Sequence, residues 1–503
     1  MHSSLYVSVL IALPMLGALV AMLLRKTPGA SYAVAMATGV VEFALTLVVA
    51  VLYKTNIPGA AGAAGFDFAT RHVLSAPLGL AYDVSLDGLS LLMVVLTGLV
   101  LVLALWGARD QRREPAFVAW LLVLTGLTMG SFVSHDVLEF FVFFELTLVP
   151  CYFIISGWGG KERNRAALKF FLYTFTASAP LLVGILYLGF AVQHQHPTQG
   201  LSFAYGTLMG ASISHATAVW LFVAFAVAFG AKSPIWPLHT WSPLTYAEAP
   251  TAGSIVLSAL LAKLGSYGLL RFAVGLLPLA MTSVRPYVMT LAVIGIFYGS
   301  ILAAVSSELK RFVAYSSLAQ MGFITLGVVS GSTIGVTGAV LLMFNHGVIT
   351  MAFFLMIGFL EKRRMSTQIA DFAGLQRPMP VLAALFTVTM LASIGLPGLS
   401  GFVSEYLILI GTFTTHAWWS VTAALGVLAS AVYLLWAYQR VFHGRAEGAN
   451  AALEDASSRE RWVLVPLIVL IVVLGVFPKP VLDRISPSVH TLVTMVATAS
   501  VTK

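Results

Sequence analysis

The sequence predicts an all-α integral membrane protein of about fourteen spanning helices, and two observations lead to this fold class. First, 59% of the 503 residues are hydrophobic and 10% are charged, whereas soluble domains carry about 25% charged residues. Second, apolar runs of about 18 residues or more recur along the whole chain, and the mean hydropathy is +0.93. No polar stretch is long enough for a separate soluble domain, so we expect one membrane domain.

The apolar runs place each expected span between short polar loops, to within about 2–4 residues. The first run ends at Arg25 and Lys26. We interpret it as a membrane helix rather than a removed signal, because further spans follow it and no convincing A-x-A cleavage site does. The expected spans are residues 4–24, 31–53, 84–107, 115–133, 136–157, 167–192, 214–242, 252–274, 286–306, 310–329, 333–360, 380–413, 417–442 and 462–478.

Basic residues indicate the orientation of the helices. The loops 54–83 and 193–213, which follow even-numbered helices, hold only Lys54 and Arg71. Cytoplasmic loops are rich in Lys and Arg, so we expect a multi-pass protein of the bacterial cell membrane with both termini on the outer side. The formal charge of +8 then needs no nucleic acid as a partner. The strong basic clusters all follow odd-numbered helices: Arg25 and Lys26; Arg109, Arg112 and Arg113; Lys161, Arg163 and Arg165; Lys310 and Arg311; Lys362, Arg363 and Arg364; Arg440, Arg445, Arg459 and Arg461.

Two predicted helices contain breaks. The seventh carries AKSPIWPLHTW with Pro234 and Pro237, and the twelfth carries IGLPGLSGF with Gly395 and Pro397. Proline removes a backbone donor and clashes with the preceding turn, and paired broken helices in two halves point to an ion site. The breaks lie five helices apart, so we expect two inverted five-helix repeats, helices four to eight and nine to thirteen. The corresponding divisions are 1–110, 111–275, 276–445 and 446–503, the last holding a cytoplasmic connection, the final helix and a C-terminal tail.

Four ionisable residues stand out within the predicted spans: Glu145, Lys232, Lys263 and Glu405. A charge at the centre of a membrane helix costs roughly 2.5–3.5 kcal/mol, so four cost on the order of 10 kcal/mol. That cost is comparable to a whole folding free energy of about 5–15 kcal/mol, and it indicates a role beyond packing, with the four side chains facing one another or a hydrated interior as candidates for proton transfer. The alternative is that two buried Lys–Glu pairs only fix helix packing. Lys232, beside the break, can also extend its amine toward the interface.

Three further polar residues extend this set as a secondary relay: His239, His346 and Gln320. Imidazole titrates near neutral pH and suits a proton relay, although each histidine can instead be neutral and bonded to a helix carbonyl. Gln320 cannot exchange a proton, but it can hold water. Asp136 and Glu139 open the fifth span, where helix capping is the expected role.

Other chemistry finds little support in the sequence. Cys151 is the single cysteine, so the chain can form no internal disulfide and offers no cluster for iron–sulfur or zinc. It has no phosphate-binding loop and no paired-histidine pattern typical of haem. We expect no metal or cofactor in this chain. The aromatic residues around Glu145 are interpreted as helix packing rather than a quinone site: Phe140, Phe141, Phe143, Phe144 and Tyr152.

Several motifs resemble the antiporter-like subunits of respiratory complex I (NADH–quinone oxidoreductase). They are KSPIWPLHTWSPLTYAEAPTAGSIVLSALLAKLGSYGLLRF, LKRFVAYSSLAQMGF, the NHG at Asn345–Gly347, and GLPGLSGFVSEYLILIG. The segments RAALKFFLYTFTAS and RERWVLVPLIVLIVVLGVFPKPVLD resemble the subunit M (mitochondrial chain 4) branch in particular. The resemblance covers most of the chain after about residue 80. EAPTAGS with its following lysine is shared with Mrp-type antiporters and membrane-bound hydrogenases.

The resemblance implies proton pumping coupled to quinone reduction elsewhere in a complex. The glutamate–lysine pair matching Glu145 and Lys232 gates the channel, the lysine matching Lys263 relays the proton, and the glutamate matching Glu405 passes it on. It also implies that flavin, iron–sulfur clusters and quinone belong to other subunits. The implied partners are neighbouring antiporter-like membrane subunits, the lipid bilayer, protons and water.

The chain departs from the family pattern at three positions. Leu244 and Tyr246 stand where the family usually has an acid and a histidine, and Gln320 stands where it often has histidine. Such changes fit a divergent complex I or a complex-I-like assembly. The alternatives are a subunit of an Mrp-type sodium/proton antiporter, a subunit of a membrane-bound hydrogenase or oxidoreductase, and a purely structural scaffold.

Overall fold

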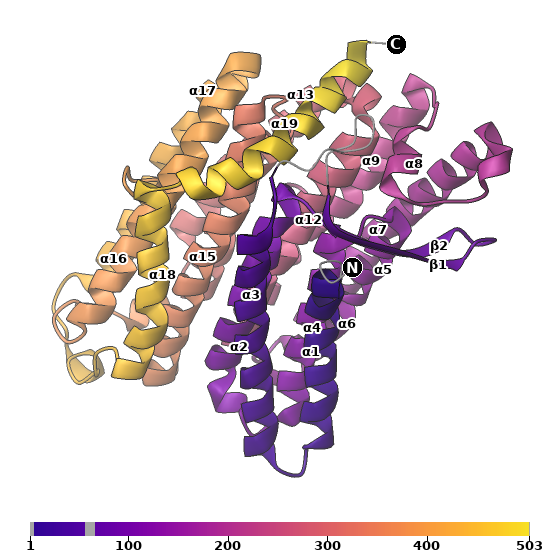
Figure 1. Cartoon of the computed structure of the whole chain (residues 1–503). Helices are drawn as coiled ribbons and strands as arrows, with labels where there is room; N and C mark the ends of the chain where they lie inside the picture. The colour runs from indigo at the N-terminus through magenta and orange to yellow at the C-terminus, as the bar shows by residue number, and fades with distance from the viewer. Residues whose placement is uncertain (1–4, 56–65, 502–503) are drawn as a thin grey trace.

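A computed structural model of the chain describes residues 5–55 and 66–501. Ser4, segment 56–65 of the expected 54–83 loop, and the last two residues of the C-terminal tail lie outside the described residues. The protein is a bundle of mostly parallel and antiparallel helices, with the N-terminal and C-terminal halves of the chain on opposite sides (Figure 1).

The N-terminal part holds four long helices. It also holds a β-hairpin, which the sequence analysis did not predict. The helices are α1 (Leu5–Leu23), α2 (Pro28–Leu52), α3 (Gly88–Gly107) and α4 (Pro115–Val133). The antiparallel strands β1 (Asp67–Ser75) and β2 (Leu80–Leu86) pair Thr70 with Val84 and lead into α3. Asp87 caps α3 by accepting from the backbone of Leu89 and Ser90, which satisfies two amides that the helix cannot bond itself.

The middle of the chain contains the first predicted break. Its helices are α5 (Val137–Leu146), α6 (Leu148–Trp158), α7 (Arg163–Gln195), α8 (Tyr205–Met209), α9 (His215–Lys232), α10 (Ser242–Glu248), α11 (Thr251–Val256) and α12 (Ala262–Gly268). Helix α9 ends at Lys232, directly before the Pro234–Pro237 segment, as the prolines predict. Two π-helical turns, Leu257–Leu261 and Leu269–Val274, lie on either side of α12 and join α11, α12 and the turns into one buried rod.

The C-terminal half contains the second break. Its helices are α13 (Met281–Val305), α14 (Leu309–Val328), α15 (Thr333–Arg364), α16 (Pro380–Ile394), α17 (Ser400–Phe442), α18 (Ser458–Val476) and α19 (Lys479–Val501). Helix α16 ends at Gly395, whose φ of +83° is left-handed and suits glycine. Helix α17 has non-helical dihedrals at His416 and bends sharply there, which lets Ser420 Oγ donate to the carbonyl of Leu409 at 2.7 Å.

Eleven helices among the described residues are long and apolar enough to cross a membrane, or twelve if the bent α18–α19 pair is one span. The sequence analysis expected about fourteen. The difference lies in α14 and in the long α17. Helix α14 is not among the eleven, and α17 counts once although its two arms match the second part of the predicted span 380–413 and the predicted span 417–442.

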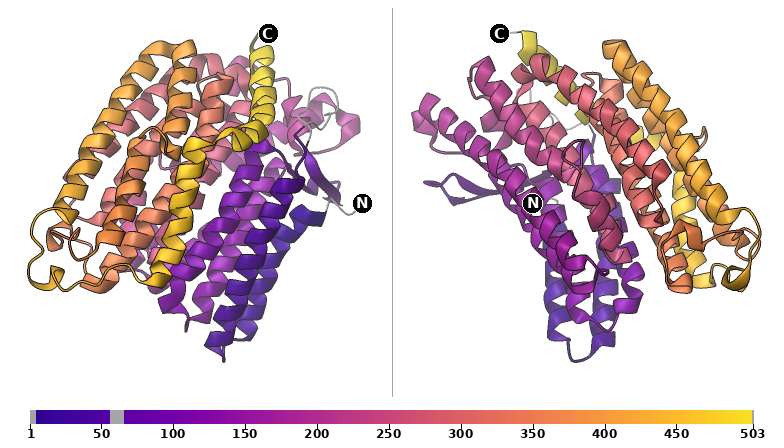
Figure 2. Two further views of the ribbon diagram at one scale, coloured as in Figure 1. Left: turned by 60° about the vertical axis from the view of Figure 1, so that its left-hand side comes forward. Right: turned by 180° about the vertical axis from the view of Figure 1, so that it is seen from behind.

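The last helix also differs from the prediction of a simple tail. Helices α18 and α19 meet at an angle of 68°, and α19 lies across one end of the bundle (Figures 1 and 2). It contacts α15 in the C-terminal half and α3 in the N-terminal half. Ser488 Oγ accepts from the amide of Gly88 at the start of α3, so α19 ties the two halves together.

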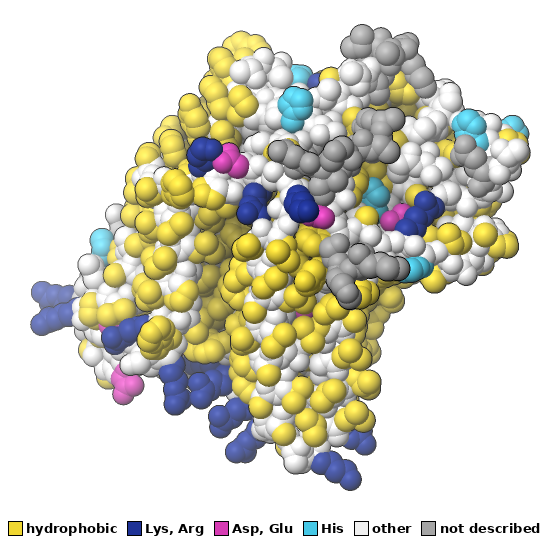
Figure 3. All heavy atoms as spheres, in the orientation of Figure 1, with side chains coloured by type: hydrophobic (Ala, Val, Ile, Leu, Met, Phe, Trp, Pro, Cys, Tyr) yellow, Lys and Arg dark blue, Asp and Glu magenta, His cyan; other side chains and the backbone are white. Residues whose placement is uncertain are grey.

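The visible outer surface suits a bilayer. Hydrophobic side chains cover the flank of the bundle in Figure 3, and Lys and Arg gather mainly at the end that carries the α1–α2 turn and the α15–α16 and α17–α18 connections. In contrast, the apolar stretches of α15 and of the rod formed by residues 251–274 are wholly buried inside the bundle. Helices buried in a bundle and carrying ionisable groups are where an ion path through a membrane protein is expected.

Candidate functional site

Lys232 lies at the end of α9, where the first break begins, and is 2% exposed. Its Nζ donates to the carbonyl of Phe144 at 2.8 Å and to Thr147 Oγ1 at 3.0 Å. The ammonium also lies 4.1 Å from the centre of the Phe144 ring, a cation–π contact. Both acceptors come from the place where the fifth predicted span is interrupted between α5 and α6. Lys232, at the break that ends α9, therefore bonds to the interruption between α5 and α6.

Glu145 is next to Phe144, yet it does not hold Lys232 in this structure. Both carboxylate oxygens of Glu145 are buried without a hydrogen-bond partner among the described residues. The ammonium is turned to the Phe144 carbonyl instead. The two predicted partners therefore lie close together, and no ion pair joins them in the described part of the chain.

Polar contacts continue from the first break to the next helix. Ser233 follows Lys232, and its hydroxyl donates to the carbonyl of Ala262 at 2.9 Å and lies 3.1 Å from Ser266 Oγ. Ala262 directly precedes Lys263. These contacts hold Lys232 and Lys263 at one level on adjacent helices, with Lys232 directed toward α5 and Lys263 toward α15.

Lys263 is completely buried on α12. Its Nζ donates to the carbonyl of Ser258 at 2.6 Å and lies 2.6 Å from His346 Nδ1. The Ser258 carbonyl belongs to the π-helical turn 257–261, where the wider backbone alters the usual hydrogen-bond pattern. A lysine bonded to an imidazole nitrogen can transfer a proton to it directly. At 2.6 Å, this is also the shortest contact between two side chains among the predicted site residues.

His346 and its neighbour lead into the second broken helix. Asn345 Nδ2 donates to the carbonyl of Ser400 at 2.8 Å and to Ser404 Oγ at 3.2 Å. Both serines lie on the first turns of α17, and Ser404 directly precedes Glu405. The adjacent residues Asn345 and His346 on α15 thereby connect the Lys263 side of the site to the Glu405 side.

Glu405 and Gln320 form the far end of the site. Gln320 Nε2 on α14 donates to Glu405 Oε1 at 2.9 Å, and both side chains are buried. Gly395 permits this arrangement, because a Cβ there would lie 2.4 Å from Glu405 Oε2. The glycine that ends α16 therefore also leaves room for the carboxylate.

His239 is the one predicted relay residue that lies apart from this series. It follows the first break and lines a cavity of about 380 Å³ together with Arg165, Lys169 and Arg311. Its ring packs edge-on against Tyr298 with centroids 5.0 Å apart, and its Nδ1 has no hydrogen-bond partner. The cavity lies beside two of the basic clusters that predicted the cytoplasmic side.

Some of the buried polar atoms that have no partner among the described residues lie along this site, and others lie elsewhere in the bundle. Those along the site belong to Glu145, Ser258, His346, Asn345, Ser400 and Gln320. Buried polar atoms in proteins are nearly always bonded, to protein or to ordered water. The arrangement therefore offers binding positions for water between the direct contacts. Among residues 5–55 and 66–501, no group of three or more His, Cys, Asp or Glu side chains is placed to hold a metal ion.

Sequence reasoning missed several residues that shape the site. Thr147, Ser233 and Ser258 carry no charge, so nothing in their residue type marks them. Arg271 and Asp87 could have been found, because Arg271 lies in an apolar run; they form a buried ion pair at 2.5 Å beside the site helices. The capping role expected for Asp136 is confirmed, since its Oδ1 accepts from the amides of Leu138 and Glu139.

Fold and site together define a class: an α-helical membrane protein in which buried ionisable side chains connect two broken helices. Residues 134–431 match the family described as NADH:quinone oxidoreductase/Mrp antiporter, transmembrane. The chain belongs to this family. It is 39% identical to NADH-quinone oxidoreductase subunit M of Rhodobacter capsulatus, over 83% of each chain. It is 37% identical to subunit M of Mycobacterium tuberculosis, over 98% of this chain and 94% of that one.

Solved structures give the same fold. A chain of respiratory complex I from Thermus thermophilus matches with a TM-score of 0.86 and 30% identity, over 97% of this chain and 99% of that chain. A chain of an Mrp complex from a Dietzia species matches with a TM-score of 0.80 at 18% identity, over 99% of this chain and 100% of that chain. At that lower identity the likeness concerns the fold alone.

Proposed function

We propose that this chain is the proton-translocating, antiporter-like subunit of M type in an NADH:quinone oxidoreductase. One observation carries the proposal: buried polar contacts occur on neighbouring helices at Lys232, at the Lys263–His346 pair and at the Gln320–Glu405 pair, and Ser233 and Asn345 bond between those helices. Relatives of M type that are 37–39% identical support the choice of complex. The chain couples quinone reduction elsewhere in the complex to proton transfer across the membrane.

The proposed architecture is fourteen spans in two inverted five-helix repeats. The sharply bent α17 supplies two spans, α14 and α18 supply one each, and α16 joins the first arm of α17 across the Gly395 break. Repeats at 111–275 and 276–445 then follow three N-terminal helices in 1–110, and 446–503 holds the last connection, α18 and α19. The gathering of Lys and Arg at one end supports a cytoplasmic position for that end and an outer position for both termini.

In the proposed mechanism, the first step is movement of Lys232 between two positions. Beside Glu145, its ammonium is paired with a carboxylate. At the Phe144 carbonyl and Thr147 Oγ1 the pair is separated, and the proton can pass toward Lys263. Moving one charge against 100 mV costs about 2.3 kcal/mol. Separation of one buried ion pair involves several kcal/mol, so a single pair suffices to drive the step.

The second step passes the proton through histidine to carboxylate. Lys263 Nζ gives a proton to His346 Nδ1 over 2.6 Å, and His346 Nε2 releases one on its other side. Water bonded to Asn345 and Ser400 then carries it to Glu405, whose position Gln320 fixes. Gln320 orients the carboxylate and does not itself carry a proton. Flavin, iron–sulfur clusters and quinone belong to other subunits in this proposal, and neighbouring antiporter-like subunits are the partners.

The test is proton pumping by the complex reconstituted in vesicles, with quinone reduction measured alongside. Glu145→Ala should lower pumping, because Lys232 then lacks its paired position. Glu162→Ala, on the exposed loop before α7, is the matched control and should leave pumping unchanged. Wild-type pumping in Glu145→Ala would refute the assignment. Proton release that depends on a sodium gradient would favour the alternative, an Mrp-type sodium/proton antiporter subunit.

A further inference from the structure

Arg285 occupies an unusual place at the end of the bundle opposite the basic clusters. It lies in the first two turns of α13, just after an even-numbered span, where Lys and Arg are otherwise scarce. A cation at a helix N-terminus also opposes the helix dipole. Neither membrane orientation nor helix stability therefore explains an arginine here.

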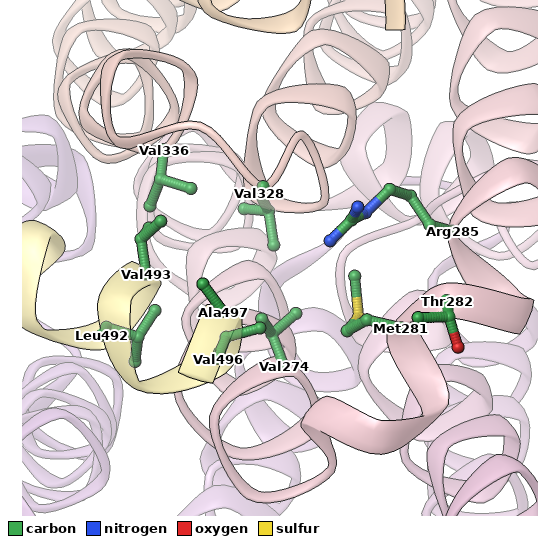
Figure 4. Close-up of a pocket in the computed structure, with 11 residues that line it drawn as sticks. Val274, Met281, Thr282, Arg285, Val328, Val336, Leu492, Val493, Val496 and Ala497 are labelled. Carbon is green, nitrogen blue, oxygen red and sulfur yellow. The ribbon is translucent and has the colours of Figure 1, made fainter. Parts of the chain in front are cut away.

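The side chain of Arg285 points into a cavity of about 170 Å³ beneath α19 (Figure 4). Its Nε is buried without a hydrogen-bond partner in the part of the chain that the structure describes. The guanidinium lies against Gly331, whose φ is +72° and where a Cβ would come within 2.9 Å of Nη2. The left-handed glycine thus lets the guanidinium reach the cavity, and none of the described residues that line it is acidic and could neutralise the charge.

The rest of the cavity wall is largely apolar. It is formed by Val274, Met281 and Val328 from the bundle and by Leu492, Val493 and Val496 from α19. An apolar cavity of roughly 150 Å³ stays dry and accepts a hydrocarbon ligand. One guanidinium at the edge of an apolar cavity is complementary to an anionic head group with an attached hydrocarbon chain.

The surroundings place this cavity at the level of lipid head groups. The turn between α14 and α15 is tied to the turn of α17, because Thr415 Oγ1 donates to the carbonyl of Ser330 at 3.0 Å. Near these turns Tyr287 is 74% exposed and Trp418 is 81% exposed. Exposed Tyr and Trp mark the membrane–water interface. A lipid phosphate would therefore lie at the depth of Arg285.

We propose that this cavity binds one anionic phospholipid, with the phosphate at Arg285 and part of an acyl chain between α13 and α19. The bound lipid joins α19, which also contacts α3, to the C-terminal half of the bundle. The proposal does not depend on which ion the chain translocates.

The experiment is photo-crosslinking in the purified complex with a phosphatidylglycerol that carries a diazirine in its acyl chain. Crosslinks should map to the α19 peptide that contains Leu492 and Val493. Arg285→Gln should lower the yield about tenfold, as expected for the loss of a charge-assisted contact, whereas Arg285→Lys should keep most of it. Val493→Trp, which fills the cavity, should also lower the yield, and Arg311→Gln at the opposite end should not.

Three results would overturn the proposal: equal yields in wild type and Arg285→Gln, equal labelling by a phosphatidylcholine analogue, or loss of labelling when inorganic phosphate is added in excess. The last result would mean that the guanidinium binds a soluble anion. Crosslinking is read independently of pumping, so failure here leaves the proton-transfer assignment untouched.

Discussion

Thr147 gives the sharpest test of the Lys232 movement. In the separated arrangement Lys232 Nζ has two hydrogen-bond acceptors, the Phe144 carbonyl at 2.8 Å and Thr147 Oγ1 at 3.0 Å. Thr147→Val removes one acceptor with almost no change of shape at a fully buried position. A hydrogen bond to a charged group contributes about 1.5–3 kcal/mol, so the separated position should become about ten to a hundred times less populated.

The assay is the rate of proton uptake by reconstituted vesicles, normalised to the amount of assembled complex. Thr147→Val should slow pumping by about tenfold or more, if the separated position is needed in each cycle. Thr147→Ser keeps an oxygen there and should restore most of the rate. Thr97→Val is the matched control, because Thr97 is also fully buried but bonds only to its own helix, at the Met93 carbonyl. Equal rates in Thr147→Val and Thr97→Val would refute the reasoning.

Three further outcomes are expected. Gln320→Leu removes the 2.9 Å hydrogen bond to Glu405 and should lower proton uptake about tenfold, whereas Gln320→His should keep most of the wild-type uptake. Equal rates in wild type and Gln320→Leu would argue against a positioning role for Gln320. Arg271→Gln leaves Asp87 as an unpaired buried charge and should lower the free energy of unfolding by about 3–5 kcal/mol, seen as a lower thermal-unfolding midpoint of the purified chain. Burial, reinforced by the positive charge of Arg271, lowers the pKa of His135 to about 3. The folded state then binds fewer protons than the unfolded state below about pH 6.5, so acidification should destabilise wild type more than His135→Gln, and identical pH profiles of the unfolding midpoint would contradict this.

The breaks and the buried charges could be predicted because they follow from residue type alone. Pro234 cannot continue α9, and Gly395 with Pro397 ends α16, whatever surrounds them. Lys263 and Glu405 are conspicuous in apolar runs for the same reason. The structure pairs Lys263 with His346 and Gln320 with Glu405, and their action as one relay stays a prediction.

The directions of the side chains could not be predicted. Lys232 is turned to the Phe144 carbonyl rather than to Glu145. This orientation depends on contacts between α9 and α5, which residue type alone does not show. The π-helical turns beside Lys263 carry no proline or glycine break that would mark them. His239 lies in a separate cavity, in the turn segment between α9 and α10.

The missed elements have physical reasons as well. Strand β2 has the sequence LAYDVSL and runs directly into the apolar α3, so its last residues were assigned to the span 84–107. Helix α19 contains Pro487 and many polar residues, and its apolar residues lie on one face. Such a helix covers the end of a bundle but lacks the continuous hydrophobicity that marks a span.

The most direct test of the central claim is the number of protons translocated per quinone reduced when Lys263 is replaced. Lys263→Met keeps the volume of the side chain and removes the one group that joins Ser258 to His346. If the buried series carries protons, the reconstituted variant must translocate fewer protons per quinone or lose quinone reduction together with pumping. A variant with the wild-type ratio and the wild-type rate would contradict the account.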